Sequence, residues 1–565
     1  MSSAPSAEPT DWVTRAADDA VRHWERAGDT SKPVTVASGI SPSGPIHLGN
    51  LREFLTSHFV AEELRSRGLN VRHLHSWDDY DRYRKVPAGA PAEWAEHIGK
   101  PLTAVPDPWE CHASWAEHFK EPLRAALAEM GCVMEEINQT EQYQAGTYRD
   151  QVLHAIANRS TIENVLARYR TKPVEAESEQ EAAALADSVT ADDEAAGTDE
   201  FARFPFKPYC RGCGKDTTTI TAYDDATTEL SYTCDSCGES HTINVATDFE
   251  GKLVWKVDWP MRWAFEGVNF EPGGLDHSTP GSSYTVGKEL VKEIFDATAP
   301  SYVAYAFVGF AGRQKMSSSA GGVPIPADAL RVLEAPMLRW LYARRAPKQA
   351  FTIDFGPEVV RLYDEWDSLT KKAKAGLKRD VQVLAFERAA STRAAGELPT
   401  PRTTVPFRLL SSVADVTAGN ADVIASVVAG SGYELDSIED LQPRLDRAMT
   451  WMSEYVAEED RTTVRETPAE RLGELSETEA GWISTLLAEL PQPFTLDGLT
   501  TIIYGVPKLA HGLSLEDAPT DEVKADQKAL FALLYDLLVA AERGPRLPTL
   551  FLALGEEKIR ALLTR

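Results

Sequence analysis

The sequence contains no run of about 18 apolar residues, the length that a membrane-spanning helix needs. Its first residues, Met1 to Ser6, have neither a basic residue nor an apolar stretch, so we expect no signal peptide. Positive charge is also scarce: 58 lysines and arginines face 86 aspartates and glutamates, a formal net charge of −28. This balance argues against a general nucleic-acid binder, because such proteins hold phosphates through a surplus of Lys and Arg.

Cysteine is rare as well, with six in 565 residues, and four of these form two Cys-x-x-Cys pairs. The pairs are Cys210 with Cys213 and Cys234 with Cys237, and 20 residues separate the inner cysteines, a spacing typical of zinc ribbons. Four thiolates satisfy tetrahedral zinc, and a site closed in this way is structural rather than catalytic. The segment 217–232, rich in threonine and tyrosine, predicts a hairpin between the pairs. Zinc fits a reducing, cytoplasmic compartment better than disulfides do.

A second group of possible metal ligands lies in the segment 107–118. Aspartate, cysteine and histidine all bind zinc, and here they are Asp107, Cys111, His112 and His118. On a helix, positions 107, 111 and 118 would share one face, whereas position 112 would point elsewhere unless the helix began or bent there. A metal site and ordinary side chains on a helix surface are alternative interpretations.

A phosphate-binding turn is predicted early in the chain. The run Val34 to Ser38 is typical of a buried strand, a turn rich in Gly, Pro and Ser follows, and we expect a helix from near His47 to about Arg67. The N–H groups and the dipole of such a helix start favour negative charge, and the His47 imidazole can donate to phosphate oxygens. Much later, the loop 315–319 (Lys-Met-Ser-Ser-Ser) offers a lysine and hydroxyl groups to a leaving polyphosphate.

Carboxylates follow the second predicted strand, which covers Asn70 to His75. Strand, helix and strand with short links imply a parallel, right-handed crossover, and ligands in such sheets bind beyond the carboxyl ends of the strands. Asp78 and Asp79 lie at this position. A buried ammonium group needs a paired anion, so we expect one of the two to recognise an ammonium-bearing substrate. Helix N-capping is the alternative for either residue.

In this order, the turn at His47 and the loop at Lys315 resemble the HIGH and KMSKS signatures of class I aminoacyl-tRNA synthetases. Three stretches are similar to the class I lysyl-tRNA synthetases: Ala-Ser-Gly-Ile-Ser-Pro-Ser-Gly from residue 37, His-Ser-Trp-Asp-Asp-Tyr-Asp-Arg-Tyr-Arg-Lys-Val-Pro from residue 75, and Lys-Val-Asp-Trp-Pro-Met-Arg-Trp from residue 256. The resemblance covers about residues 12 to 360. Asn50 replaces the second histidine of one signature and Ser318 the second lysine of the other, which leaves fewer charges for a triphosphate.

The resemblance implies an α/β Rossmann-type (HUP) catalytic domain with an inserted zinc-ribbon region, and an all-α C-terminal anticodon-binding helical domain. The segment from Glu175 to Glu200 is acidic and poor in large apolar residues, so we expect disorder there. We also expect helices over 11–26 and 148–169, a strand over 253–260 and no strands beyond 327. The expected domains are an N-terminal helical extension (1–30), two catalytic halves (31–170 and 251–349), an acidic insertion (171–203), a zinc ribbon (204–250) and the helical domain (350–565).

The resemblance also implies roles for individual residues. The expected catalytic residues are His47, Asn50 and Lys315. The expected ATP-binding residues are Pro42, Ser43, Gly44, Gly49, Asp276, Met316, Ser317, Ser318 and Ser319. The expected lysine-binding residues are Gly39, Ser41, Asp78, Trp255, His277 and Tyr305. The segment 107–118 is similar to a zinc site of archaeal class I lysyl enzymes.

The implied activity is that of a lysine–tRNA ligase. The carboxylate of L-lysine attacks the α-phosphorus of ATP, which carries Mg²⁺, and pyrophosphate leaves. The lysyl group then passes from the adenylate to the 3′ end of tRNA(Lys), with release of AMP. Phosphoryl-group chemistry of this kind relies on positioning and charge neutralisation. The expected partners are ATP, L-lysine and tRNA(Lys), and no membrane.

Because the chain is so acidic overall, a tRNA would have to bind to local basic stretches. The candidates are Arg339, Arg344, Arg345 and Lys348, and the run Lys371, Lys372, Lys374, Lys378 and Arg379. Solvated helix faces are the alternative for both.

Three other functions stay open: a class I synthetase for glutamate, arginine or cysteine, an adenylyltransferase that never binds tRNA, and a zinc-ribbon binding protein on an inactive synthetase fold.

Overall fold

A computed structural model describes residues 10–87, 89–170, 201, 203–279, 281–310, 322–376 and 379–564. The loop at Lys315 and most of the predicted acidic insertion, residues 171–200, lie outside this described part. Within it, no helix has both the length and the apolar character needed to cross a membrane. The chain divides into two compact units, the first made of Met1–Ala329, Leu338–Ile353 and Lys372–Leu398, the second of Leu330–Met337, Asp354–Lys371 and Pro399–Arg565.

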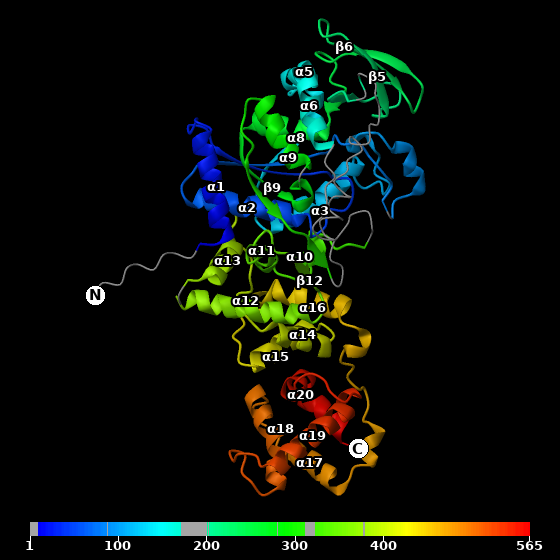
Figure 1. Ribbon diagram of the computed structural model, residues 1–565. Helices are drawn as coiled ribbons and strands as arrows, with labels where there is room; N and C mark the ends of the chain where they lie inside the picture. Colours follow the sequence, from blue (N-terminus) through cyan, green and yellow to red (C-terminus); the bar gives the residue numbers. More distant parts are fainter. Residues whose placement is uncertain are drawn as a thin grey trace, which may run out of the picture. The chain divides into compact units, whose positions relative to one another are not determined.

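The first unit is built on a five-stranded parallel sheet with the order β10-β9-β1-β2-β3. Figure 1 labels its strand β9. The strand order reverses at β1, which pairs with β2 on one side and β9 on the other. Doubly wound sheets bind their ligands beyond such a reversal point, so the topology confirms the predicted α/β class. The strands are β1 (Val34–Ile40), β2 (Val71–Trp77), β3 (Glu135–Asn138), β9 (Val268–Gly274) and β10 (Ser301–Tyr305).

Helices cover both faces of this sheet. On one face, α1 (Trp12–Arg26) and α2 (Leu51–Ser66) pack against Val34 and Val36 of β1. On the other face, Ala37 packs with the tryptophans of α8 (Trp255–Glu266), as expected when side chains alternate along a strand. The further helices of this unit are α3 (Trp115–Glu129), α4 (Gln139–Gln144), α5 (Arg149–Ala157), α6 (Arg159–Arg170), α9 (Ser283–Glu293) and α13 (Val381–Ala390).

The expected strand over 253–260 is wrong. The strand β8 (Gly251–Leu253) ends there, and α8 begins at Trp255. Val254 and Val257 favoured a strand, but three tryptophans recur every fourth residue, at 255, 259 and 263. Their rings contact one another along one helix face. Burial of the indoles outweighs the local β preference, which is the more context-dependent signal.

Three other expected elements have different limits. The helix after the first turn begins at Leu51, because residues 47–50 form a turn. The helix expected over 148–169 is two helices, which break at Asn158. Beyond residue 327 there are short strands: β12 (Phe351–Ile353) pairs with β11 (Val308–Phe310), and β13 (Ser391–Thr392) with β14 (Gly396–Glu397). Strands of two or three residues leave no periodic pattern to detect.

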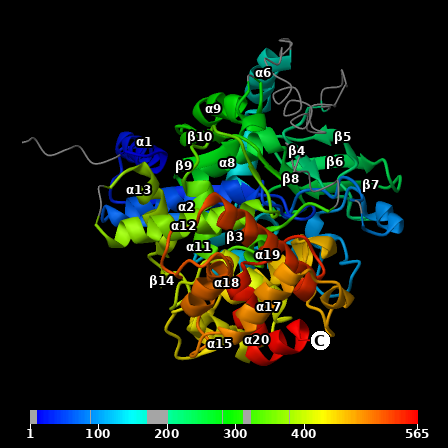
Figure 2. The same ribbon diagram turned by 90° about the horizontal axis from the view of Figure 1, so that it is seen from below.

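The four paired cysteines belong to a segment built around a three-stranded antiparallel sheet, which we call the cysteine lobe (residues 209–250). Its strands are β5 (Thr218–Tyr223), β6 (Glu229–Cys234) and β7 (Ser240–Asn244), so the predicted hairpin is confirmed. The lobe is inserted between β4 (Phe206–Pro208) and β8, which pair with each other (Figure 2). We call β4 and β8 the stem of the lobe.

The described part of the second unit contains helices and their connections but no strand. Apolar side chains of its last four helices share one core. Ser476 and Glu479 form a capping box at one helix start, and the Thr520 side chain caps another. The helices are α14 (Phe407–Val416), α15 (Ala421–Gly430), α16 (Arg444–Tyr455), α17 (Glu477–Ala488), α18 (Leu496–Ala510), α19 (Asp521–Val539) and α20 (Leu547–Leu563), while α10 (Pro326–Leu330), α11 (Ala335–Ala343) and α12 (Glu358–Lys374) each contain residues of both units.

Candidate active site and metal centres

The predicted phosphate-binding turn presents a neutral imidazole just after β1. His47 Nδ1 accepts a hydrogen bond from the N–H of Asn50 at 3.3 Å, and Asn50 Oδ1 accepts one from the N–H of His47 at 3.1 Å. Burial lowers the pKa of His47 to about 4, so near pH 7 the ring is neutral and carries its proton on Nε2. Gly49 leaves room for this ring, because a Cβ there would stand 2.8 Å from His47 Cε1. The turn thus holds one N–H donor in a fixed orientation.

A buried carboxyl group, Glu53, lies among the residues predicted to bind lysine. It belongs to the first turn of α2, and the N–H of Gly39 and the hydroxyl of Tyr305 favour its charged form. Burial and then the neighbouring carboxyl groups of Glu271 and Asp276 raise the pKa of Glu53 well above its usual range. Within the described residues no Lys or Arg side chain pairs with Glu53. A cationic ligand would favour the ionised form of Glu53, because it offsets the effects of burial and of the neighbouring carboxyl groups.

Glu271 is held by two indole groups of α8. Trp259 Nε1 donates to Glu271 Oε1 at 3.1 Å and Trp263 Nε1 to Oε2 at 2.6 Å. Burial raises the pKa of Glu271 to about 7. The predicted lysine-binding pair Trp255 and His277 meets in the same region, with ring centroids 6.4 Å apart. The buried Nδ1 atom of His277 has no hydrogen-bond partner in the described structure, so it is available to a ligand.

Asp78, the carboxylate favoured from the sequence, already has a cationic partner. Arg262 Nη1 lies 2.7 Å from Asp78 Oδ1 and also donates to Ser76 Oγ at 2.6 Å. Burial raises the pKa of Asp78 to about 6, and Arg262 opposes this shift. The Ser41 hydroxyl donates to the backbone oxygen of Asp78 at 3.4 Å. With its charge matched, Asp78 is better suited to positioning the loop at Ser41 than to pairing with a substrate ammonium.

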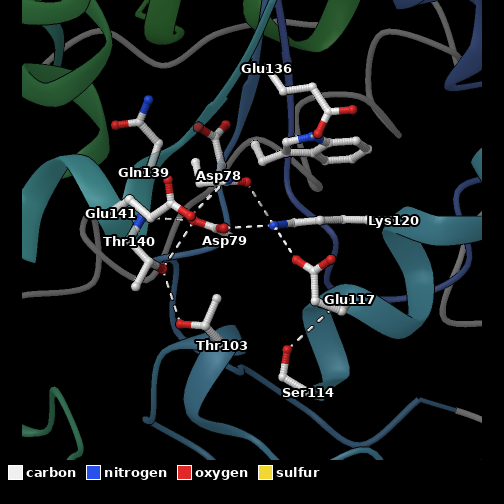
Figure 3. Close-up of polar contacts among 12 residues, drawn as sticks. Asp78, Asp79, Thr103, Ser114, Glu117, Lys120, Glu136, Gln139, Thr140 and Glu141 are labelled. Atoms are coloured by element: carbon white, nitrogen blue, oxygen red, sulfur yellow. Dashed lines mark hydrogen bonds and ion pairs between the residues drawn. The ribbon is translucent and has the colours of Figure 1, made fainter. Parts of the chain in front are cut away.

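Asp79 is paired as well, with Lys120 of α3 (Figure 3). Lys120 Nζ lies 2.7 Å from Asp79 Oδ2 and 2.8 Å from Glu117 Oε1, and it donates to Asn138 Oδ1 at 3.0 Å. The other carboxylate oxygen of Asp79 accepts the N–H and the hydroxyl of Thr140 at 2.8 and 3.0 Å, at the start of α4. This geometry agrees with the capping alternative for Asp79.

The four cysteines of the lobe converge. Their sulfur atoms all lie within 4.8 Å of one another, with 3.7 Å between Cys210 and Cys237 and 3.5 Å between Cys213 and Cys234. Tetrahedral zinc with Zn–S bonds of about 2.3 Å separates its sulfur ligands by about 3.8 Å. The donor set and its spacing therefore fit a structural zinc ion.

The second cluster also converges, but not on a helix face. Residues 107–114 form turns and bends, and α3 begins only at Trp115 with Ser114 as its cap. Cys111 Sγ lies 3.1 Å from His112 Nδ1 and 3.3 Å from His118 Nδ1, and the potential ligand atoms of all four residues are within 4.8 Å of one another. The irregular segment brings in His112, which a helix would have turned away.

The predicted basic patches are less basic than the sequence implies. Arg339 is fully buried and donates to the backbone oxygens of Met130, Arg388 and Ala389, so it is not a surface contact for tRNA. In the second stretch, Lys372 pairs with Asp380 and Arg379 with Glu387. Lys378 lies outside the described residues.

Comparison with known proteins identifies the family to which the chain belongs. A family model for class I (K) tRNA synthetases matches residues 10–391. A lysine–tRNA ligase of Streptomyces coelicolor is 50% identical over 582 residues, covering 99% of each chain. Lysine–tRNA ligases of Thermococcus kodakarensis (33% identity, 97% of this chain and 98% of the relative) and Treponema pallidum (31%, 94% of each) are also similar. The chain therefore belongs to the class I tRNA synthetases. Within that class it matches the lysyl (K) group, which confirms the family that the sequence resembles.

Two residues of this site escaped sequence reasoning, Glu53 and Arg262. Nothing in the sequence marks Glu53, because the burial of every residue from Leu51 to Ala61 becomes visible only in the folded chain. Arg262 stands inside the stretch that resembles the lysyl family, but its role depends on which carboxylate it reaches. That is a property of the folded chain.

Proposed function

We propose that this protein is a lysine–tRNA ligase that activates L-lysine with ATP and transfers it to the 3′ end of tRNA(Lys). Membership of the family supports this activity, and the observation that carries the choice of amino acid is Glu53. This buried carboxyl group has no cationic partner within the described residues, and Glu271 and Asp276 lie near it. An amino acid whose side chain ends in an ammonium group supplies the missing positive charge.

In this proposal Glu53 and Tyr305 receive the side-chain ammonium of lysine. Gly39, Ser41, Trp255 and His277 keep the lysine-binding roles predicted from the sequence. Asp78 then acts through the Ser41 loop rather than on the substrate ammonium, because Arg262 already pairs with it.

ATP would bind at the turn that follows β1. The neutral His47 would donate a hydrogen bond from its Nε2–H group to a phosphate oxygen. This contact needs neither proton transfer nor a charge on the ring. Asn50 holds that ring through its own N–H group. Pro42, Ser43, Gly44 and Asp276 keep their predicted ATP contacts. Lys315 and its loop would neutralise the leaving pyrophosphate, with Mg²⁺ bound to the phosphates.

The two clusters of potential metal ligands would each hold zinc. The four cysteines would stabilise the cysteine lobe, and Asp107, Cys111, His112 and His118 would pin the segment before α3. Neither cluster contains a member of the predicted catalytic set, so both ions would be structural. All six cysteines are free thiols, which agrees with a cytoplasmic location.

The test is ATP–pyrophosphate exchange by the purified protein with each of the twenty amino acids, with and without tRNA. We expect exchange with lysine, and aminoacylation of tRNA(Lys). Exchange with a different amino acid alone would contradict the lysine assignment, and silence with all twenty in the presence of tRNA would contradict the activity.

The Glu53→Gln variant tests the site. Loss of the carboxylate should raise the KM for lysine about 30-fold or more, as when one partner of a buried charge pair is removed, with little change in the KM for ATP. Glu62→Gln on the same helix, where the glutamate pairs with Arg65, is the matched control and should leave both constants unchanged. An unaltered lysine KM in Glu53→Gln would remove Glu53 from the pocket.

A further inference from the structure

Five charged side chains meet between the stem of the cysteine lobe and the end of β2. Lys252 Nζ lies 2.6 Å from Asp81 Oδ1 and 3.8 Å from Asp258 Oδ2, and Arg262 Nε lies 3.4 Å from the same Asp258 oxygen. Arg262 reaches Asp78 at 2.7 Å. All except the partly exposed Asp81 are buried. Asp258 is therefore shared by the two cations.

One end of this network belongs to the lobe. Lys252 is the middle residue of β8, and β8 pairs with β4 to form the stem that carries residues 209–250. The hydroxyl of Tyr143 donates to Asp258 and accepts the N–H of Leu253 at 3.3 Å. The stem is thus fastened through both a side chain and its backbone.

The other end belongs to the amino-acid site. Arg262 lies 5.3 Å from the ring centroid of Trp255, a predicted lysine-binding residue. Its partner Asp78 donates its N–H to the Ile40 backbone oxygen at 2.9 Å and accepts the Ser41 hydroxyl. Arg262 therefore orders both the indole and the loop that follows β1.

The network holds one more carboxylate than it has cations. Three carboxylates face two cations, so loss of either cation leaves two carboxylates in excess in a largely buried place, which is strongly unfavourable. If Lys252 loses its charge, Asp258 has only Arg262 as a cationic partner. Arg262 is then drawn towards Asp258 and away from Asp78.

We propose that Lys252 and Arg262 are positioning residues that hold the lysine pocket in a fixed position relative to the cysteine lobe. This inference rests on the proposed function, since it concerns how the same pocket is held. Neither residue touches the reacting atoms. The buried charge network of the stem therefore couples the cysteine lobe to amino-acid binding.

The experiment compares variants of the full-length protein in ATP–pyrophosphate exchange, with zinc content measured on each. Lys252→Met keeps the length of the side chain and removes its charge. It should raise the KM for lysine about tenfold, equivalent to about 1.4 kcal/mol, with kcat and the KM for ATP nearly unchanged. Lys252→Arg should restore the wild-type KM. Lys207→Met is the matched control, because Lys207 lies directly across the stem from Lys252 and has no ion pair in the described structure.

A double variant separates charge balance from packing. Lys252→Met combined with Asp81→Asn removes the cation and its closest carboxylate together, so most of the tenfold loss should be recovered. If Lys252→Met does not fold, Arg262→Lys should give the same rise in lysine KM, because an ammonium cannot reach Ser76, Asp78 and Asp258 at once. A wild-type lysine KM in the folded variant, or an equal fall in kcat with unchanged KM, would overturn the inference. Absence of lysine exchange by the wild-type protein would instead contradict the proposed function.

Discussion

Gly49 is the residue on which the orientation of His47 depends. A Cβ at this position would stand 2.8 Å from Cε1 and 2.9 Å from Nδ1 of that ring, closer than real Cβ contacts. In Gly49→Ala the ring must turn, and its Nδ1 loses the N–H of Asn50. We expect the kcat of exchange to fall at least about tenfold, while the free energy of unfolding changes by about 1 kcal/mol or less.

The control for this substitution is Gly481→Ala, in the described helix α17. No atom lies within 4 Å of a Cβ built there, and the backbone does not have a positive φ. Activity should be unchanged, and stability should rise slightly because alanine favours helix. Equal exchange rates in Gly49→Ala and the wild type would show that the ring does not contribute to activation.

At the residue scale, the sequence identifies which groups take part better than how they pair. The motif residues His47 and Asn50 bond each other, because they share one tight turn. The partners of Asp78 and Asp79 could not be predicted, because Arg262 lies 184 positions away and Lys120 lies 41 positions away. A carboxylate that looks available in the sequence can be neutralised by a helix added much later.

Three histidines between α2 and β2 make stability depend on pH. His58, His73 and His75 are buried, and neither nitrogen of His58 has a hydrogen-bond partner in the described structure. Burial lowers the pKa of all three below 6.5, to about 3 for His73, and nearby cations, including Arg65, add to the effect.

At these three histidines the unfolded chain binds protons below pH 6.5 that the folded chain does not, so they lower stability as the pH falls, by up to about 4 kcal/mol per pH unit until His73 itself takes up a proton. The raised pKa of Glu53, Asp78 and Glu271 acts in the opposite direction, because these carboxyl groups take up protons in the folded chain first. Urea unfolding of the wild type and of His58→Leu between pH 7.5 and 4.5 isolates one histidine. Below pH 6.5 the difference in the free energy of unfolding should grow in favour of the variant by about 1.4 kcal/mol per pH unit. An identical slope in the variant would mean that His58 does not contribute.

At the scale of elements, the strand–helix–strand order and the hairpin of the cysteine lobe follow from local patterns. The helix α8 does not, because Val254 and Val257 favour a strand, whereas the burial that decides the outcome is contributed by the sheet beneath. The irregular segment before α3 is a similar case: a helical reading separates His112 from its neighbours, and the actual turns bring it to Cys111.

At the scale of the whole molecule, the second unit has its own buried charge network. Arg444 donates to Glu334 at 2.6 Å and to Asp367 at 2.8 and 2.9 Å, so it joins three separate segments of that unit. Arg444→Met should remove the ion-pair partner of the buried Glu334, although Arg447 also lies near it, and cost about 3 kcal/mol in the stability of this unit. Hydrogen exchange of the backbone amides in α14 and α16 measures this loss of stability.

The exposed pair of Arg402 and Asp436 offers a comparison, since both side chains are about 70% exposed or more. Arg402→Met should change protection of the same amides by about 1 kcal/mol at most. Similar protection in the two variants would mean that burial adds nothing to the Arg444 network.

The topology of the sheet also sets the order in which a growing chain acquires its parts. The central strand β1 bonds β9 through Thr35 and Asn269, which are 234 positions apart. At about 5–20 residues per second, a ribosome needs roughly 10 to 50 seconds to bridge that distance. During this interval one edge of β1 has no partner strand, and Glu53 exists without Glu271 or Tyr305. A chain whose synthesis stops before β10 therefore lacks part of the lysine site that we propose, and that site can form only after the cysteine lobe has been made.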